Sequence, residues 1–531
     1  MEWATDLFVP FGFVAIGQDI RGTEQSQGNY TMWHSEANDS RDLGDWIVSQ
    51  EWSDGRVFTL GASADGLASL QTPKTLPPWL SGQYIIWCPA IAYDILLPNG
   101  AYKQKTVEDW LNALTMPIPE VVKGNIQTIY NNEAHTDYWK QIELDDNYYN
   151  SINWPSAFWA GWYDLFVVGT LEAFQGFNAK SAASVRHTSK IVIDPCGHCI
   201  DAGEYFKQNT ADGRTAIVIA QMYELLGIDN DVFRERGPVK NVTFYVMSSN
   251  DDAGNAAGNY WTSLDDFPQY KPTDYYLSGD HTASVRLPSK DAPASTTYKY
   301  DPTNPIPTMG GNNLPPGIGG TIACGPLDQS SIDSRDDMVV FNVAADDKEL
   351  VMSGPIDAEL YVSSDMVDTD FMVRVSDVYN DAAGTVRLLQ DNAVRMRWRE
   401  GGLEPVPVKS GEVYKISMSL WNTSFVLAPG HNLRFVVQSS NFPRFSVNNN
   451  NGILLADPAY PGEPRVAHNT IYHSARYPSK IILPIITAPK RIALPEVHML
   501  KEVQQRYPHV TDDVVVKVQK WMDTLGKVGR K

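Results

Sequence analysis

The sequence predicts an α/β fold followed by an all-β domain, on the evidence of two patterns. Up to about residue 238, short apolar runs alternate with helical patterns, which is typical of a mostly parallel sheet flanked by helices. From about Val242 to Pro484, many short alternating strands are separated by turn clusters such as Gly310-Gly-Asn-Asn313, which is typical of a β-sandwich. The 531 residues are enough for two or three domains.

Hydrophobic periodicity predicts the individual elements. The apolar N-terminal stretch is expected to form a helix that runs into a buried strand at Phe13–Gln18. A helix with Leu43, Trp46 and Ile47 on one face should end before Asp54-Gly55. Further strands are expected at Val57–Leu60, Tyr84–Trp87, Ser156–Ala160 and Ile191–Asp194, and in the β part at Asn241–Met247, Ala358–Val362, Phe371–Val375 and Leu433–Val437.

A segment rich in proline, tryptophan and tyrosine interrupts the α/β pattern between residues 73 and 149. Its helix-like pieces predict a cap that covers one end of the sheet. The last forty residues, from Arg491, carry a helical pattern and are mildly basic. The predicted domains are a core made of residues 1–72 and 150–238, the cap at 73–149, a β domain at 239–490 and a helical tail at 491–531.

The charge balance excludes some partners. The formal net charge is −20, and such a surface repels nucleic-acid backbones and anionic membranes. No stretch is long and apolar enough to cross a bilayer, and the apolar start follows Glu2 and Asp6 rather than the basic residues of a signal peptide. The cytoplasm is therefore the default location, and the sequence leaves the compartment and the formation of homo-oligomers open.

Ser63 stands where an expected strand meets an expected helix, in Gly61-Ala-Ser-Ala-Asp-Gly66. A sharp turn of this kind presents the serine Oγ above the sheet, and small neighbours let the backbone bend. The N–H of the next residue, Ala64, would lie at a helix N-terminus and could stabilise an oxyanion. The motif alone is weak, because the usual elbow has glycine where this chain has Asp65, and an ordinary glycine-bounded turn is the commoner explanation.

Two later residues complete a chemical set. Asp164 follows the strand expected at Ser156–Ala160, and His198 follows the strand expected at Ile191–Asp194. The order serine, acid, histidine is that of α/β-hydrolases, and loops after the carboxyl ends of parallel strands converge on one site. An imidazole takes the serine proton while a carboxylate fixes its tautomer. Either residue alone would be an ordinary loop residue, but the ordered set favours catalysis.

A redox alternative comes from Cys196-Gly-His-Cys199, which fits a C-x-x-C motif. In thioredoxin-like proteins this motif opens a helix early in a compact domain, whereas here it follows the last strand of a much larger sheet. The favoured interpretation is that two small residues flank a catalytic histidine. No metal-ligand spacing appears, and serine-based acyl transfer needs no metal or organic cofactor.

Taken together, these and further motifs resemble those of the cocaine esterase and X-Pro dipeptidyl-peptidase family of serine hydrolases. The residues that carry the resemblance are Gln18–Gly22, Glu51–Val57, Asp137–Lys140, Ala160–Asp164 and Asp194–His198, and in the β part Ser334–Asp337, Val367–Phe371, Val394–Arg397 and Ser439–Pro443. The resemblance implies an α/β-hydrolase core, a helical cap and a C-terminal jelly roll that forms part of the active-site wall. It also implies Ser63, Asp164 and His198 as the catalytic triad, the same residues that strand order and spacing indicate.

Three departures from the family matter. Family members carry further strands and a tyrosine-bearing loop before the segment that matches Trp3–Gly22, so the sequence is expected to be N-terminally incomplete. The missing strands would leave a gap in the sheet beside Val57–Leu60, and the missing tyrosine would weaken the oxyanion hole. Ala64 replaces the usual aromatic residue after the nucleophile. Leu165-Phe166-Val167 is apolar where α-amino-acid ester hydrolases place acidic residues to hold a substrate ammonium.

The predicted function is hydrolysis of an ester or amide bond through an acyl-enzyme, with a small-molecule ester or a short X-Pro peptide as substrate. Trp79, Trp87, Trp110 and Trp154 could line an acyl pocket, although core packing is the commoner role of any one of them. The alternative is a catalytically impaired binding protein that uses the jelly roll, a weaker inference because it rests on fold analogy.

Overall fold

Five apolar segments pair as a parallel sheet in the first part of the chain. They are β1 (Val57–Ala62), β2 (Leu80–Ile86), β3 (Ser156–Gly161), β4 (Lys190–Asp194) and β5 (Val242–Ser248), paired in that order, with β6 (Tyr260–Leu264) antiparallel to β5. β3 and β5 are buried along their whole length, as parallel strands are when both faces of the sheet are covered. The computed structural model describes residues 2–114, 119–195, 198, 206, 211–228, 240–249, 258–316, 319–490, 504–505 and 507–517.

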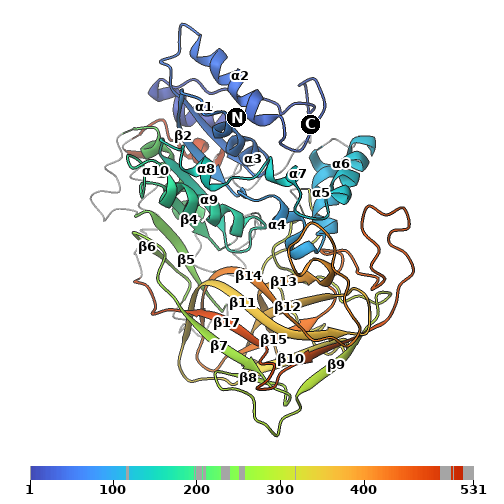
Figure 1. The fold of residues 1–531 in the computed structure, drawn as a ribbon. Coiled ribbons are helices and arrows are strands. Elements are labelled where there is room, and N and C mark those ends of the chain that lie inside the picture. Colours follow the sequence, from blue (N-terminus) through green and yellow to red (C-terminus); the bar gives the residue numbers. More distant parts are fainter. Residues whose placement is uncertain are drawn as a thin grey trace.

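Two groups of helices accompany the sheet (Figure 1). The first group consists of α1 (Glu2–Phe8), α2 (Glu36–Val48), α3 (Ala64–Gln71), α9 (Val167–Lys180) and α10 (Ala211–Leu225). The second group lies between β2 and β3 in the chain and consists of α4 (Tyr93–Leu96), α5 (Gln104–Leu114), α6 (Pro119–Asn131), α7 (Asp137–Lys140) and α8 (Asp146–Tyr149). We call residues 93–149 the cap. Short 3-10 turns lie at Val9–Phe11, Thr72–Thr75, Pro98–Gly100 and Met396–Trp398.

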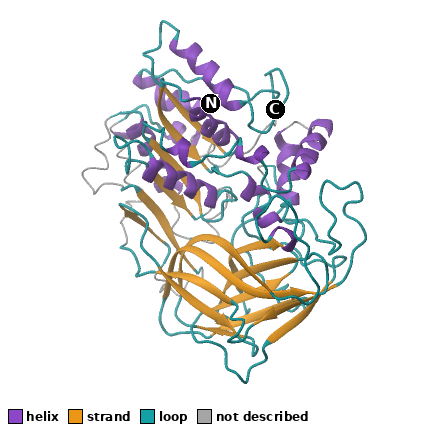
Figure 2. Ribbon diagram, in the orientation of Figure 1, coloured by secondary structure: helices purple, strands orange, loops and turns teal. Residues whose placement is uncertain are grey.

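The second half of the chain is built mainly from antiparallel strands and lies below the α/β part in Figure 2. One set pairs in the order β10 (Met338–Val343), β15 (Asn432–Gln438), β12 (Asp370–Val378) and β13 (Val386–Arg395). A second set is centred on β11 (Leu350–Ser364), which pairs with β14 (Tyr414–Leu427), β16 (Ala467–Tyr472) and β17 (Lys480–Ile485). The remaining strands are β7 (Lys271–Leu277), β8 (Thr282–Ser284) and β9 (Ser295–Tyr300). We call residues 271–485 the β domain.

Most of the predicted elements are confirmed. The strands predicted at Val57–Leu60, Ser156–Ala160 and Ile191–Asp194 lie in β1, β3 and β4, and the strands predicted in the β part lie in β5, β11, β12 and β15. The helix predicted around Ile47 is α2, with Ile47 buried, although Trp46 is half-exposed and contacts Trp52.

The strand predicted at Phe13–Gln18 is wrong. These residues have no regular secondary structure, and Val14 and Ile16 are 57% and 38% exposed. Apolar residues make a strand only where a neighbour accepts the backbone hydrogen bonds, and among the described residues β1 pairs with β2 alone. Contact with the core comes instead from single side chains, such as Phe13 edge-on to Phe58.

Two parts of the core sheet come from ranges predicted for other domains. β2 lies within residues 73–149, and β5 and β6 lie within residues 239–490. A buried apolar run has the same pattern in a parallel sheet and in a sandwich, so the pattern alone does not assign it. Of the predicted tail, the described residues 504–505 and 512–517 are helical, and Tyr507 and Val514 are buried against the core. Among the described residues, no helix is both long enough and apolar enough to cross a bilayer.

The buried carboxylate of Glu133 joins the cap to the β domain. It accepts hydrogen bonds from Nε and Nη2 of Arg397 at 2.9 and 2.6 Å. It also accepts from Nε1 of Trp398 and from the backbone N–H of Leu455, both at 2.8 Å. Four donors from two separate segments of the β domain therefore converge on one side chain of the cap, which is only 5% exposed.

Further buried charges lie behind this contact. Arg397 pairs with Asp368 at 2.7 Å, and Arg395 pairs with Asp370 at 2.9 Å. The amide of Asn448 donates to both carboxylates, at 2.9 and 2.8 Å. The strand motifs Val367–Phe371 and Val394–Arg397 thus supply a cluster of paired and hydrogen-bonded charges, the arrangement in which buried ions are tolerated.

Glu133→Ala should destabilise the protein strongly, because it leaves the Arg397 guanidinium buried with one carboxylate fewer. Removing one partner of a buried ion pair typically costs about 3–5 kcal/mol. The measurement is the urea concentration at the midpoint of unfolding, with tryptophan fluorescence as the signal. Glu412→Ala is the control, because its pair with Lys409 lies at the surface and such pairs contribute about 0–1 kcal/mol. Equal midpoints for the two variants would contradict the anchoring role of Glu133.

Candidate active site

Ser63 occupies a strained turn between β1 and α3. Its backbone has φ 57° and ψ −124°, a conformation that non-glycine residues rarely adopt and that occurs at functional sites. The Ser63 N–H donates to the carbonyl of Ile86 on the neighbouring strand at 3.0 Å, and its carbonyl accepts from Leu67 N–H at 3.0 Å. The predicted elbow geometry is therefore present, and sheet and helix hold it from both sides.

Two glycines allow the close backbone contacts of this turn. A Cβ on Gly61 would lie 2.3 Å from the carbonyl oxygen of Asp65, and a Cβ on Gly66 would lie 2.7 Å from the Cβ of Cys88. Gly61 lets the strand approach the first turn of α3, and Gly66 lets α3 pack on the end of β2. The glycine three residues after Ser63, rather than two, thus has a packing role of its own.

Asp164 follows β3 in a tight turn that begins at Gly161. The Asp164 N–H donates to the Gly161 carbonyl at 3.0 Å, and the carboxylate is fully buried. Its Oδ1 accepts from the Phe166 N–H at 2.6 Å, and its Oδ2 accepts from the His198 N–H at 2.9 Å. These backbone donors fix the direction of the carboxylate.

His198 lies between Asp164 and Ser63. Its Nδ1 makes a hydrogen bond with Oδ2 of Asp164, and its Nε2 is 3.1 Å from Oγ of Ser63. The ring is fully buried and packs against Trp87, at 5.1 Å between ring centroids, and edge-on against Phe166 at 5.2 Å. The three residues predicted from the sequence meet at the carboxyl ends of β1, β3 and β4.

An apolar pocket of about 480 Å³, including its mouth, opens beside Ser63. Among the described residues, Ser63 and Thr106 contribute hydroxyl groups to the lining. The Thr106 hydroxyl has no hydrogen-bond partner among these residues. The apolar lining comes from the loop before α2, from α3, from the segment after β2, from the cap, from the two residues after Asp164 and from the β domain. It consists of Trp33, Ala64, Leu67, Pro89, Ala92, Ile95, Leu96, Trp110, Leu165, Phe166 and Leu314.

Of the four tryptophans predicted as candidates for the pocket, the structure places Trp110 in the lining. Trp79, Trp87 and Trp154 are buried in the core instead, and Trp79 and Trp154 donate to Asp45 and Gln83. The predictions missed Trp33, which stacks on Trp110 at 5.0 Å between ring centroids and donates from Nε1 to the Ala64 carbonyl at 3.0 Å.

Burial shifts the ionisation of groups around the site. Desolvation, together with the charge of Asp164, raises the pKa of the Cys88 thiol well above its usual value. Burial, reinforced by Arg444, holds the pKa of the Lys103 ammonium well below its usual value. The Lys103 Nζ lies 4.2 Å above the ring of Trp421 in the β domain. Both groups are fully buried, which accounts for the direction of both shifts.

Cys196 and Cys199 of the C-x-x-C motif lie outside the described residues, whereas Cys88 is a buried free thiol and Cys324 is disulfide-bonded. In the described part of the chain, no three His, Cys, Asp or Glu side chains are grouped so that they could hold a metal ion.

Family models match two parts of the chain. Residues 1–120 match the X-Pro dipeptidyl-peptidase (S15 family) model, and residues 238–482 match the X-Pro dipeptidyl-peptidase C-terminal non-catalytic domain. Among characterised relatives, cocaine esterase of Rhodococcus sp. (strain MB1 Bresler) is 26% identical over 90% of this chain and 89% of its own length.

Solved structures share the fold. An α-amino acid ester hydrolase aligns with a TM-score of 0.73 and 20% identity, covering 91% of this chain and 87% of its own. An aminopeptidase from a marine sediment archaeon, Thaumarchaeota archaeon, has the same identity and coverage with a TM-score of 0.74. A CocE/NonD family hydrolase from Staphylococcus aureus aligns with a TM-score of 0.62 at 17% identity, covering 88% of this chain and 79% of its own. With both family models and a full-length esterase relative matching, the chain belongs to the cocaine esterase and X-Pro dipeptidyl-peptidase family and is a serine hydrolase.

Proposed function

We propose that the protein hydrolyses esters of uncharged, apolar carboxylic acids through a covalent acyl-enzyme formed on Ser63. One observation carries the proposal: the buried His198 ring contacts Ser63 Oγ with one nitrogen and the Asp164 carboxylate with the other. This is the arrangement in which an imidazole can remove the serine proton and return it to a leaving group.

The reaction proceeds in two halves. Ser63 Oγ attacks the acyl carbon as its proton passes to His198 Nε2, and the alcohol leaves with that proton. Water then attacks the acyl-enzyme, with His198 as the base, and releases the acid and the free serine. Asp164 holds the imidazole in the tautomer that carries hydrogen on Nδ1 and stabilises the imidazolium. The Ala64 N–H, at the first position of α3, donates to the oxyanion.

The pocket supports ester rather than X-Pro dipeptide specificity. A dipeptidyl-peptidase substrate brings a free ammonium group to the site, and burying an unpaired charge in an apolar pocket is costly. Leu165 and Phe166 line the pocket directly after the acid, and the described residues of the lining include no carboxylate. Trp33 and Trp110 instead offer flat apolar surfaces suited to an aromatic or branched acyl group.

We also infer that the β domain is a jelly roll, as the family resemblance implies. Support comes from its two sets of antiparallel strands, one around β12 and β15 and one around β11 and β14. Its Leu314 lies in the lining of the pocket, which supports a direct contribution of this domain to substrate recognition.

Ser63→Ala should abolish both labelling by a fluorophosphonate probe and hydrolysis of p-nitrophenyl esters, with kcat lowered by at least about 10⁴-fold. The reason is that no other group can form the acyl-enzyme. Ser49→Ala, at the exposed end of α2, is the matched control and should label like the wild type. A folded wild-type protein that takes up no probe would instead support the non-catalytic binding protein.

Asp164→Asn should lower kcat by about 10⁴-fold and leave KM within a few-fold, because the amide no longer selects the required histidine tautomer. The measurement is steady-state hydrolysis of p-nitrophenyl butyrate. Asp146→Asn is the control, since that carboxylate is 73% exposed in a surface pair with Lys180. Comparable losses in the two variants would rule out a specific role for Asp164.

A substrate panel tests the specificity. We expect kcat/KM for p-nitrophenyl benzoate and phenylacetate to exceed that for p-nitrophenyl glycinate by at least about tenfold, since about 1.4 kcal/mol of unfavourable ammonium burial is enough for that ratio. Gly-Pro and Ala-Pro p-nitroanilides should be cleaved slowly or not at all. Efficient cleavage of the proline anilides would overturn the ester assignment while leaving the serine mechanism in place.

A further inference from the structure

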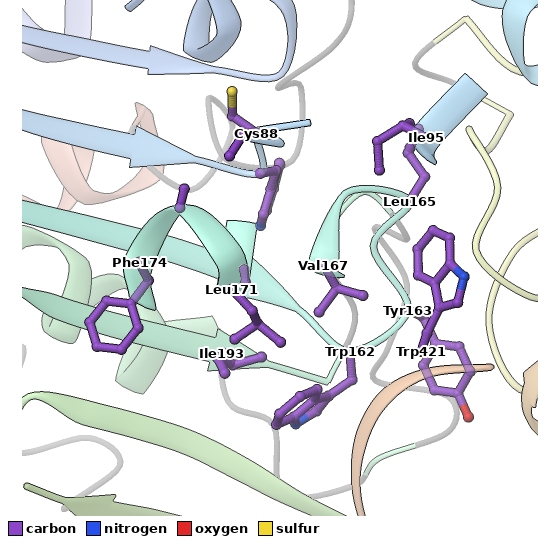
Figure 3. Packing of buried hydrophobic residues seen from close by; sticks show 14 of the residues in the cluster. Cys88, Ile95, Trp162, Tyr163, Leu165, Val167, Leu171, Phe174, Ile193 and Trp421 are labelled. Carbon is purple, nitrogen blue, oxygen red and sulfur yellow. The ribbon is translucent and has the colours of Figure 1, made fainter. Parts of the chain in front are cut away.

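Side chains and backbone of the β domain hold the turn that carries Asp164. We call residues 161–165 the acid turn; three of its residues, Trp162, Tyr163 and Leu165, appear in the buried cluster of Figure 3. The side-chain amide of Asn312 donates to the Asp164 carbonyl at 2.9 Å and reaches the Trp162 carbonyl at 3.4 Å. The Tyr163 hydroxyl donates to the Leu388 carbonyl at 2.8 Å.

Asn312 is itself held firmly. It follows Gly310 and Gly311, which have φ values of 70° and 89°, a conformation that favours glycine. Two hydrogen bonds between Gly311 and Gly325, of 2.9 and 3.0 Å, close the segment at its base. The Asn312 side chain is 1% exposed, so its amide has little freedom to bond elsewhere. The turn cluster seen in the sequence therefore places one amide against the acid turn.

The contact bears on the carboxylate through the backbone. The acid turn is closed by the Asp164 N–H bond to Gly161, and the carbonyls of Trp162 and Asp164 point out of it to one amide group. Each carbonyl has a second donor, Gln390 Nε2 at 3.3 Å for Trp162 and the Val167 N–H at 3.2 Å for Asp164, but Asn312 makes the shorter bond to Asp164 and is the group that joins the two carbonyls. Loss of Asn312 would therefore weaken the hold on the peptide planes 162–163 and 164–165 that contain these carbonyls. Rotation of these planes would turn the carboxylate away from His198 Nδ1.

We propose that Asn312 is a positioning residue for the acid of the triad, so that the β domain contributes to the rate of the reaction as well as to the fold. The proposal rests on the proposed function, because it requires Asp164 to act on His198. It assigns Asn312 an effect on kcat, since misplacement of a catalytic group by about 1 Å can cost on the order of 100-fold.

The neighbouring residue Asn313 is a matched control. It is also fully buried and also donates through its amide, but to the carbonyls of Gly310 and Ala323 within its own segment, both at 2.8 Å. Asn313→Ala thus disturbs the same segment without removing a hydrogen bond to the acid turn. A purely structural role for the segment predicts equal effects of the two alanine variants.

The test is a double-mutant cycle on the full-length protein, with hydrolysis of p-nitrophenyl butyrate as the readout. Asn312→Ala should lower kcat by about 10- to 100-fold with KM within about twofold, whereas Asn313→Ala should change kcat by less than about threefold. In the Asp164→Asn background, Asn312→Ala should have no further effect on kcat, because the group it positions is already disabled. Asn312→Leu, which keeps roughly the same size and removes the donor without adding a charge, should behave like Asn312→Ala.

Several results would overturn the proposal. Equal losses of kcat in the wild-type and Asp164→Asn backgrounds would mean that Asn312 does not act through Asp164. Similar losses for Asn312→Ala and Asn313→Ala would also overturn it, as would an Asn312→Leu variant with unchanged kcat. The leucine variant decides the question if the alanine variant does not fold. If Asp164→Asn alone leaves kcat unchanged, the proposed function is wrong. This outcome differs from the results above, in which Asp164 is required but Asn312 does not position it.

Discussion

The contact between Glu133 and Arg397 is the interaction on which the placement of the cap against the β domain depends. It fixes the cap against the β domain through a fully desolvated charge pair with additional donors from Trp398 and Leu455. A second link joins the same two units nearer the pocket, where Asp109 of α5 accepts hydrogen bonds from both the backbone and the hydroxyl of Thr321. A buried ion pair adds little net stability, but any arrangement of the two surfaces that leaves one of its charges buried without a partner is strongly unfavourable.

Because these links set the distance between cap and β domain, they also set the shape of the pocket. Trp110 on α5 forms one wall and Leu314 of the β domain forms another, with Ser63 at the base. The elbow contributes strain at Ser63, which the hydrogen bond to β2 and the packing of Gly66 on Cys88 hold in place. Rigid support from several elements is what keeps the three reactive side chains within hydrogen-bond reach.

The three residues that meet at the proposed active site could be singled out from the sequence because their signals are local. Ser63 lies among glycines at a strand end, and Asp164 and His198 each follow a strong apolar run. The surroundings of these residues could not be predicted in the same way. Trp33, Leu314 and Asn312 reach the site only through contacts between distant parts of the chain, which leave no periodic pattern. The segment at Phe13–Gln18 shows the opposite error, since it has the apolar character of a strand but pairs with no other described segment.

The division of the pocket between distant parts of the chain has a consequence for biosynthesis. A ribosome releases Ser63, Asp164 and His198 well before Leu314, and the backbone donor at Leu455 that completes the Glu133 anchor emerges later still. Domains generally fold as they emerge, N-terminal first. A nascent chain therefore carries the proposed nucleophile, acid and base before the pocket beside them is complete, and on the proposed function it becomes active only after the β domain has been synthesised.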